Sequence, residues 1–373
     1  MTRSPSGKED WALPMRRALA LAEMAVGLTE PNPRVGCVLV SADGQWIGEG
    51  HTQAAGSAHA EVMALRDAQA KGHSVEGATA YVTLEPCSHY GRTPPCCDAL
   101  IAAKVARVVV AAGDPNPQVN GRGVERMRAA GIDVMAADGD AEAASRELNI
   151  GFFSRMQRGR PWIRLKAAAS LDGRTALENG VSQWITGESA RHDGHAWRKR
   201  ASALMTGSGT VLADNPRLDV RGHPIARQPL RIVLDSCLQT PPDAQLLRVG
   251  GPVLFVASRP EPSREAALRD LGADVLTQPS SEGRIDLPAL MDELGRRGIN
   301  EIHVEAGARL NASLLQHDLV DELLVYLAPM LLGPGRGIAA LSPLHELSGV
   351  RRFSFHGAQT VGEDVRLILR RQA

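Results

Sequence analysis

The chain has 373 residues, of which 43% are hydrophobic and 23% are charged. This length is about two and a half times that of a usual domain and excludes a small scaffold that needs disulfides or a metal to replace a core. The 42 basic residues balance the 42 acidic residues, and aromatic residues make up only 3%, which excludes the basic surface and the stacking platform of a typical nucleic-acid binder. We therefore predict two domains and a small-molecule partner, with no nucleic-acid partner.

Neither a membrane span nor a disulfide framework is evident in the sequence. The longest apolar stretch, ten residues from Leu323, contains a proline and is too short to cross a bilayer. Five cysteines, four of them in the first hundred residues, are more typical of reduced thiols or metal ligands than of disulfide pairs. We expect a cytoplasmic protein with no membrane partner.

Helical and strand patterns alternate through the first part of the chain. A helix over 11–27 leads to the loop TEPNPR, and strands over 35–40 and 46–50 flank a turn at Asp43-Gly44. The pattern continues with helices over 59–70, 97–103 and 124–130 and strands over 78–84, 107–111 and 132–135. Such alternation predicts a mostly parallel sheet that helices cover on both faces.

A second α/β series follows a break at Gly159 and Pro161, where helical residues that start near Asp140 come to an end. We place the junction at this break, near residues 148 to 160, with domains over residues 1–150 and 151–373. The second series comprises strands over 162–168, 203–206, 230–234, 253–256, 301–305 and 322–328, helices over 190–199, 287–297 and 311–317, and a closing strand pair over 352–355 and 364–369. Both domains are thus predicted to be of the α/β class.

Three residues have the chemistry and the placement of zinc ligands. His59 begins one predicted helix, and Cys87 and Cys96 lie ahead of another. One imidazole and two thiolates leave the fourth position of a tetrahedral zinc ion for water, as in catalytic sites. The unpaired N–H groups of a helix start favour thiolates. The sequence therefore predicts a catalytic zinc site.

Glu61 lies two residues after His59, in the first turn of the same predicted helix. From there its carboxyl group can exchange protons with the water on zinc and with departing ammonia. H-x-E followed by P-C-x-x-C is the signature of zinc nucleobase deaminases, but eight residues separate Cys87 from Cys96 here. We predict a deaminase with Glu61 as the catalytic residue.

The remaining cysteines are assigned to the core. Cys97 competes with Cys96 for the third ligand position, but its spacing from Leu100 places it on one helical face with apolar residues. Cys37 and Cys237 lie within or next to predicted strands and are expected to be buried.

The segments PNPRVGCV, HAEVMAL and EPCSHYGRTPPC resemble the deaminase half of the bifunctional riboflavin-biosynthesis enzymes, which share the longer cysteine spacing. The resemblance implies a cytidine-deaminase-like α/β/α domain over residues 1–150 that acts on a diaminopyrimidinone carrying a ribosylamino phosphate. It implies that Asn32 and His51 contact the pyrimidine and that His89 and Arg92 contact the sugar phosphate. Without it, the favoured interpretation of Asn32 is a turn residue between two prolines and that of Arg92 a solvated loop cation.

No G-x-G-x-x-G follows the first strand of the second series, so the usual dinucleotide-binding turn is absent. Two glycine-containing strand ends, in the segments 206–216 and 304–311, each precede a predicted helix whose N–H groups could hold a phosphate. Turns of this kind are usually structural, so the pattern alone is a weak sign of a nucleotide site.

The segments RLKAAASLDGRTA, SQWIT, TVLADNPRLDVR and VEAGARLNASLL resemble the reductase half of the same enzymes, whose fold is similar to dihydrofolate reductase. The resemblance implies an NADPH-dependent reductase over residues 151–373. The NADPH contacts that it implies come from Ala168, Trp184, Thr210, Asp214, Ser236 and Gly307. The substrate contacts that it implies come from Ser182, Arg198, Leu218, Arg221 and Glu305, with the arginines holding the phosphate.

The sequence assigns no general acid to the reductase. Asp214 is the best candidate, although a helix or turn cap is an equally physical role for it. Lys166 and Asp172 are candidates for polar support near the reacting carbon.

The sequence thus predicts a bifunctional enzyme with Zn²⁺ and NADPH as cofactors, which deaminates the pyrimidine and then reduces its ribosyl side chain to ribityl. One alternative is a nucleic-acid base deaminase with a fused domain, which the neutral charge and the few aromatics oppose. The other is a second domain that binds a nucleotide and regulates the first without catalysis. The apolar strand over 323–328 also leads us to expect a homo-oligomer, although the sequence alone does not distinguish an interface strand from a buried one.

Overall fold

The computed structural model describes residues 12–90, 94–117, 119–279 and 283–372. The chain forms two compact units that divide between Arg158 and Gly159, inside the junction predicted near residues 148 to 160 and eight residues beyond the 150/151 division. The reason is helix α6 (Ile150–Arg158), whose Phe152 and Phe153 are each 6% exposed and belong to the core of the first unit.

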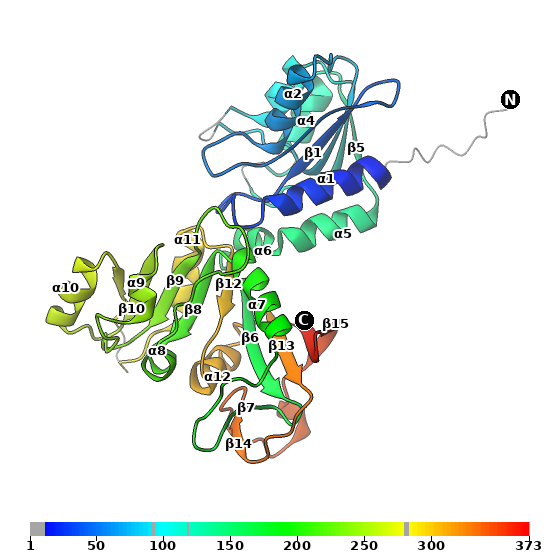
Figure 1. Cartoon of the computed structure of the whole chain (residues 1–373). Coiled ribbons are helices and arrows are strands. Elements are labelled where there is room, and N and C mark those ends of the chain that lie inside the picture. Colours follow the sequence, from blue (N-terminus) through cyan, green and yellow to red (C-terminus); the bar gives the residue numbers. More distant parts are fainter. Residues whose placement is uncertain (1–11, 91–93, 118, 280–282, 373) are drawn as a thin grey trace. The chain divides into compact units, whose positions relative to one another are not determined.

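The first unit is built on a five-stranded sheet with the strand order β2-β1-β3-β4-β5 (Figure 1). Its strands are β1 (Gly36–Val40), β2 (Trp46–His51), β3 (Thr79–Leu84), β4 (Arg107–Ala112) and β5 (Asp133–Ala136). β3, β4 and β5 are parallel, whereas β1 is antiparallel to both of its neighbours. The short connection over residues 41–45, at the turn predicted at Asp43-Gly44, can join β1 to β2 only as an antiparallel hairpin. The other four strands run in one direction, so the sheet is mostly parallel apart from β1.

Helices cover both faces of this sheet, as predicted. They are α1 (Ala12–Met24), α2 (Ala60–Ala70), α3 (Cys96–Ala102), α4 (Arg122–Ala129), α5 (Gly139–Leu148) and α6. Successive residues of β3 face opposite sides: Val82 packs with α2 and α3, whereas Tyr81 packs with α1. α1 and α5 run side by side (Figure 1).

A glycine at the end of β2 allows α2 to approach the sheet closely. A Cβ at Gly50 would lie 2.5 Å from the Cβ of Met63 and 2.8 Å from the carbonyl oxygen of Ala60, which is closer than non-bonded atoms can pack. The first turn of α2 therefore lies directly against the end of β2.

The second unit is built on a nine-stranded sheet with the order β11-β10-β9-β8-β12-β6-β13-β16-β15 (Figure 1). The strands of this sheet are β6 (Trp162–Ser170), β8 (Ala203–Gly207), β9 (Leu230–Leu234), β10 (Val253–Ala257), β11 (Asp274–Thr277), β12 (Glu301–Val304), β13 (Glu322–Ala328), β15 (Phe353–Val361) and β16 (Asp364–Arg371). The first seven in the sheet order are parallel, and β16 and β15 close the sheet as an antiparallel pair. β13 lies between β6 and β16, so the apolar strand predicted at 323–328 is an internal strand.

The two faces of this sheet differ in chemistry. The helices of the second unit are α7 (Glu188–Arg200), α8 (Ser208–Asp214), α9 (Gln245–Arg248), α10 (Pro262–Asp270), α11 (Leu287–Arg296) and α12 (Ala308–Gln316), with a 3-10 turn at Leu347–Gly349. α11 and α12 bury one face in an apolar core. On the α7 side, Arg164 is 1% exposed, pairs with Glu301 and Glu322, and stacks on the ring of Trp197 at 4.4 Å.

Several short elements were not predicted. They are α9, α10, β11 and the small ribbon of β7 (Arg174–Leu177) with β14 (Gly335–Gly337). No helix in the described part of the chain is long and apolar enough to cross a bilayer.

Candidate active sites

The three predicted zinc ligands lie together in the first unit. His59 is the N-cap residue of α2, Cys87 follows β3, and Cys96 is the first residue of α3. The Nδ1 atom of His59 lies 3.6 Å from the Sγ atom of Cys87 and 3.3 Å from that of Cys96, and the three ligand atoms all lie within 4.8 Å of one another. Among the described residues this is the one His, Cys, Asp or Glu cluster of metal-binding geometry.

The ionisation of the two thiols fits a divalent cation. Hydrogen bonds from the Cys96 side chain and from His59 lower the pKa of Cys87 to about 4, although burial opposes this shift. The Cys96 backbone N–H also donates to the Cys87 Sγ atom, at 3.3 Å. The negative Cys87 in turn raises the pKa of Cys96, as does burial. Without a positive charge between the two sulfur atoms, Cys96 keeps its proton while Cys87 is ionised. A bound zinc ion supplies that charge and binds both cysteines as thiolates, so the donor set suits zinc.

Glu61 lies in the first turn of α2 and is 3% exposed. Burial, and then the negative charge of Cys87, raise its pKa to about 7. A carboxyl group with such a pKa can both accept and release a proton near neutral pH, which is the role that the sequence predicts for it.

The predicted contacts to the pyrimidine, Asn32 and His51, and the predicted sugar-phosphate contact His89 lie at the same edge of the sheet as the zinc ligands. Asn32 precedes β1, His51 ends β2, and His89 follows β3. Because β1 is antiparallel to β2 and β3, its start meets the ends of both: Gly36 pairs with His51, and the Gly36 N–H donates to the Thr83 hydroxyl at 3.1 Å. Burial lowers the pKa of His51, which favours a neutral imidazole there.

The predicted sugar-phosphate contacts are Arg92 and His89. Arg92 lies outside the described residues. The buried Ser88 hydroxyl and His89 Nδ1 are among the described polar atoms that have no hydrogen-bond partner, so a polar ligand could bind them.

The other cysteines lie outside the ligand cluster. Cys97 and Cys37 are fully buried, and Cys97 packs in the core as predicted. Cys237 is exposed, so the expectation that it is buried was wrong: it lies in the turn after β9, beyond the end of the buried strand.

The second unit brings two helix starts together. Gly207 precedes α8 and Gly307 precedes α12, and neither helix has a side-chain cap. These helices follow β8 and β12, which are adjacent and parallel. A Cβ at Gly307 would lie 3.8 Å from the hydroxyl oxygen of Thr210. Free N–H groups of both helices are thus available to a phosphate.

The other predicted NADPH residues are spread over several elements. Ala168 lies towards the end of β6 and Ser236 follows β9, so with the segments after β8 and β12 they occupy the carboxyl ends of four adjacent strands. Trp184 is 69% exposed, and the guanidinium of Arg191 stacks on its ring at 4.6 Å. Asp214 is exposed at the far end of α8 from Thr210.

The predicted substrate arginines are already engaged with protein groups. Arg198 donates to both carboxylate oxygens of Glu305, at 2.5 and 2.8 Å, and to the carbonyl oxygen of Asp219 at 2.8 Å. Arg221 pairs with the Asp219 carboxylate. Both arginines thus have carboxylate partners in the protein without ligand, and their contact with the substrate phosphate stays a prediction.

The pair of Arg198 and Glu305 has a neighbour, His303, that the sequence analysis did not single out. Burial opposes ionisation of Glu305, but Arg198 holds its pKa well below the ordinary value. His303 is fully buried two residues before Glu305, with its Nε2 atom 3.4 Å from the carboxylate. Burial lowers the pKa of Lys166. The alternation in Glu-Ile-His-Val-Glu could have revealed this polar face of β12.

The remaining predicted residues have structural surroundings of their own. Leu218 is 3% exposed and packs with Ala201 and Leu204, so it can offer only backbone atoms to a substrate. Ser182 is half-buried in the segment between β7 and α7. Asp172 accepts hydrogen bonds from the N–H groups of residues 332 and 333, at 3.1 and 2.8 Å, which is a loop-anchoring role.

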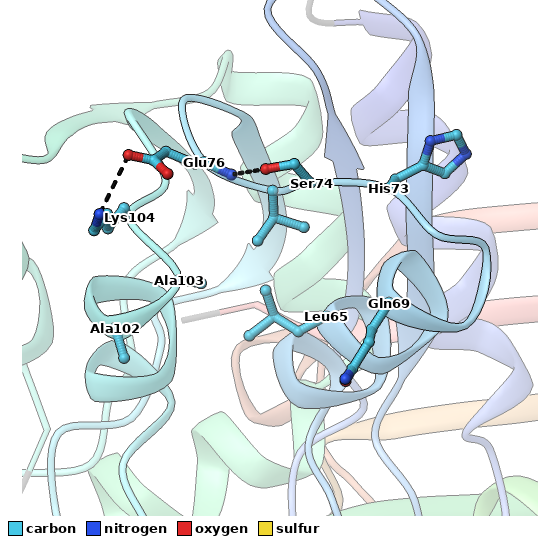
Figure 2. A pocket seen from close by; sticks show the side chains of 9 residues that line it. Leu65, Gln69, His73, Ser74, Glu76, Ala102, Ala103 and Lys104 are labelled. Carbon is cyan, nitrogen blue, oxygen red and sulfur yellow. Dashed lines mark hydrogen bonds and ion pairs between the residues drawn. The ribbon is translucent and has the colours of Figure 1, made fainter.

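A cavity of about 430 Å³ lies elsewhere in the first unit (Figure 2). It is lined by residues 65–76 and 102–104, including the exposed ion pair of Glu76 with Lys104 at 3.3 Å. It lies at the C-terminal end of α2, whereas Glu61 and His59 lie at its start. It contains none of the predicted site residues.

Comparisons with known proteins agree with both sites. Residues 161–367 match the family model described as the RibD C-terminal domain. Residues 9–112 match the cytidine and deoxycytidylate deaminase zinc-binding region. The riboflavin biosynthesis protein RibD of Escherichia coli is 49% identical over 370 residues, which cover 95% of this chain and 98% of that protein.

The chain belongs to the RibD family.

Solved structures of RibD proteins match the whole chain. Form 1 of Acinetobacter baumannii RibD has a TM-score of 0.87 at 40% identity, over 97% of this chain and 98% of that one. A Thermotoga maritima structure has a TM-score of 0.85 at 31% identity, over 97% and 99% of the two chains. The predicted fold class is confirmed: a cytidine-deaminase-like domain followed by a RibD reductase domain.

Membership of the RibD family defines the activity in outline. This RibD chain is a bifunctional riboflavin-biosynthesis enzyme with a zinc-binding deaminase domain and an NADPH-dependent reductase domain, as predicted. Both cofactors are those predicted, and the His59, Cys87 and Cys96 cluster has the donor set for the zinc ion.

Proposed function

We propose that the first unit deaminates 2,5-diamino-6-(5-phosphoribosylamino)pyrimidin-4-one to 5-amino-6-(5-phosphoribosylamino)uracil, consuming water and releasing ammonia. The second unit then reduces the ribosyl side chain to ribityl with NADPH. The Thermotoga maritima relative carries the names of these two activities. The observation that carries the proposal is the cluster of His59, Cys87 and Cys96 beside the buried Glu61.

In the deaminase, His59, Cys87 and Cys96 would hold zinc, which when bound lowers the pKa of a coordinated water towards neutrality. Glu61 would take a proton from the attacking water and deliver it to the departing amine, because its pKa lies near 7. The half-buried, neutral His51 would face the ring.

The other deaminase contacts complete the substrate site. Asn32 would hold the pyrimidine by its amide, whereas His89 and Arg92 would hold the sugar phosphate. The unpartnered Nδ1 atom of His89 supports its part of this assignment.

In the reductase, NADPH supplies the hydride and the protein positions the two reacting carbons. Ala168, Trp184, Thr210, Asp214, Ser236 and Gly307 would contact the cofactor. The uncapped starts of α8 and α12 support a phosphate position there. Ser182, Arg198, Leu218, Arg221 and Glu305 would contact the substrate, with Leu218 acting through its backbone.

Product analysis tests the proposal. The diaminopyrimidinone phosphate is supplied with and without NADPH, and the products are identified. We expect ammonia and the ribosyl uracil without NADPH, and the ribityl product with it. In Glu61→Gln, ammonia release should fall about 10²- to 10⁴-fold, the usual contribution of general acid–base catalysis, while NADPH oxidation with the deaminated substrate continues. Full ammonia release by this variant contradicts the assignment of Glu61.

We further propose that this enzyme works in the cytoplasm and binds no nucleic acid. None of its five cysteines is in a disulfide, which supports a reducing compartment, and its formal net charge of zero gives no basic footprint for a phosphate backbone. Cell fractionation and salt-dependent RNA binding test the two statements.

A homo-oligomer also remains our proposal, on different grounds from the sequence. β15 is an edge strand nine residues long, and Phe355 on it is 71% exposed. A long free edge with exposed apolar side chains favours pairing with a second copy of the chain. Light scattering should give the mass of an oligomer, and Phe355→Asp should reduce it. A monomeric wild-type protein contradicts the proposal.

A further inference from the structure

Glu85 is a buried carboxylate that neither the motif analysis nor the proposed chemistry uses. It directly follows β3, two residues before the ligand Cys87, and is 5% exposed. Its carboxylate accepts backbone N–H groups of a distant segment: Gly121 at 3.0 Å and Gly123 at 3.1 Å, with longer contacts of 3.4 Å from residues 114 and 124. A buried charge with several such donors is a fixed part of the structure.

Three of these donors, the N–H groups of residues 121, 123 and 124, belong to the start of helix α4. Its N-cap residue, Gly121, has no side chain to cap the helix, so the first N–H groups need an acceptor from elsewhere. Glu85 supplies that acceptor from β3, and its negative charge also suits the positive end of the helix dipole.

The contact between α4 and the segment before Cys87 is close on both sides. A Cβ at Gly123 would collide with the carbonyl oxygen of Pro86. The residue at position 123 must therefore be glycine for α4 to approach the chain between Glu85 and Cys87.

Helix α4 connects this contact to the other thiolate. α3 packs against α4, and Arg126 on α4 pairs with Asp98 on α3 at 2.8 Å. Cys96 is the first residue of α3. One path of packed groups thus runs from the strand end that carries Cys87, through Glu85 and α4, to the helix that carries Cys96.

We propose that Glu85 is a positioning residue of the zinc site, which fixes the separation of the Cys87 and Cys96 thiolates by clamping the end of β3 to the start of α4. It touches neither the metal nor the substrate. The proposal rests on the zinc site of the proposed function, but the two can fail separately: a wild-type chain that binds no zinc removes the site, whereas an unaltered zinc affinity in the variants below removes only the role of Glu85.

The test is the zinc dissociation constant of the full-length protein, measured by competition with a chromophoric chelator. In Glu85→Gln an amide N–H₂ replaces one acceptor oxygen, so donors at the start of α4 lose their partner while the side-chain volume is kept. We expect zinc binding about 10- to 100-fold weaker, as for other groups that orient metal ligands. Gly123→Ala should weaken it in the same direction, because it separates α4 from Pro86 without changing any charge.

Asp138→Ala is the matched control. Asp138 caps α5 in the same unit, accepting the Ala141 N–H at 2.8 Å, so its loss also removes a helix cap but one with no contact to the Cys87 segment. We expect it to lower the midpoint of unfolding and to leave the zinc dissociation constant unchanged. The visible absorption of the Co²⁺-loaded protein, which reports ligand geometry, should change in Glu85→Gln and not in Asp138→Ala.

Either of two results overturns the proposal. In the first, Glu85→Gln and Gly123→Ala bind zinc as tightly as the wild type. In the second, Asp138→Ala weakens zinc binding as much as they do, so that Glu85 contributes only general stability.

Discussion

The zinc site of the first unit and the nucleotide site of the second are built in opposite ways. The zinc site takes its ligands and its acid–base residue from the starts of two helices and the end of one strand, between residues 59 and 96. The nucleotide site is proposed to use the carboxyl ends of four strands, from residue 168 to residue 307. One is a compact motif, and the other is spread over half of the unit.

The chemistry of the two ligands explains this difference. A metal ion requires particular side-chain atoms at short distances, so residue types and spacing are both constrained. A dinucleotide phosphate can be held by backbone N–H groups at helix starts, which almost any residue supplies. Gly207 and Gly307 mark these helix starts, but glycine at a turn is common for other reasons.

The largest effect that we predict separates the two sites completely. Cys96→Ala removes one of three ligands, so we expect the loss of bound zinc and of ammonia release, while NADPH oxidation with the deaminated substrate continues. Cys97→Ala, at the adjacent core position, should keep zinc and cost only about 1 kcal/mol of stability through a small cavity. Metal analysis of both variants decides between the two cysteines. If Cys97→Ala loses zinc while Cys96→Ala keeps it, the third zinc ligand is Cys97 and its assignment to Cys96 is wrong.

A smaller effect is expected from the ion pair in the second unit. Arg198→Met leaves the Glu305 carboxylate partly buried without its bidentate partner, and we expect a loss of about 2 kcal/mol in the stability of that unit. Arg198→Met combined with Glu305→Gln should recover part of the loss, because no charge is left unpaired. The hydrogen-exchange rates of the β12 amides measure the stability of the unit in the single and in the double variant. Additive losses in the double variant would argue that the two side chains are independent.

The sequence predicted the cluster of zinc ligands, whereas the residues assigned to the nucleotide site stay predictions. His59, Cys87 and Cys96 have the expected geometry because metal ligation constrains their identity. The units divide beyond residue 150 because Phe152 and Phe153 enter the core of the first unit, which the helical pattern at residues 140–158 does not specify. The strands of the second unit were found from their apolar runs, whereas short elements such as β7 and α9 depend on tertiary packing and carry no such pattern.

The carboxylate partners of Arg198 and Arg221 could not be predicted from the sequence either. An arginine in a sequence carries the same charge whether it binds a phosphate or a carboxylate. Only the fold brings Arg198 to Glu305 and Arg221 to Asp219.

The stacking of Arg191 on Trp184 provides a more modest test of the nucleotide site. An exposed cation–π contact contributes about 0.5–1 kcal/mol, so Arg191→Leu should weaken NADPH binding about 2- to 5-fold if the contact holds the ring in place for the cofactor. Arg191→Lys, which keeps the charge but not the planar group, is the matched control. Its NADPH affinity should lie between those of the wild type and of Arg191→Leu. Energy transfer from tryptophan to bound NADPH measures the affinity. Equal affinities in all three proteins would separate Trp184 from the cofactor site.

The smallest predicted effect is a pH dependence confined to the second unit. Burial, and then the charges of Arg198 and Arg221, lower the pKa of His195 to about 4, against the opposing effect of Glu305 and Asp219. Its Nδ1 atom accepts the Arg221 N–H at 3.1 Å, which requires the neutral ring. A histidine whose pKa is lower in the folded than in the unfolded chain contributes full stability above pH 6.5, and this contribution is lost as the pH falls towards 4.

The unfolding midpoint of the wild type should therefore fall more between pH 7 and pH 5 than that of His195→Gln. The difference cannot exceed about 1.4 kcal/mol per pH unit, and solvent screening at this half-buried position reduces it. His345→Gln, at an exposed position on the same unit, is the control and should follow the wild type. If His195→Gln instead loses stability as steeply as the wild type, the Arg221 backbone N–H does not hold the His195 ring neutral.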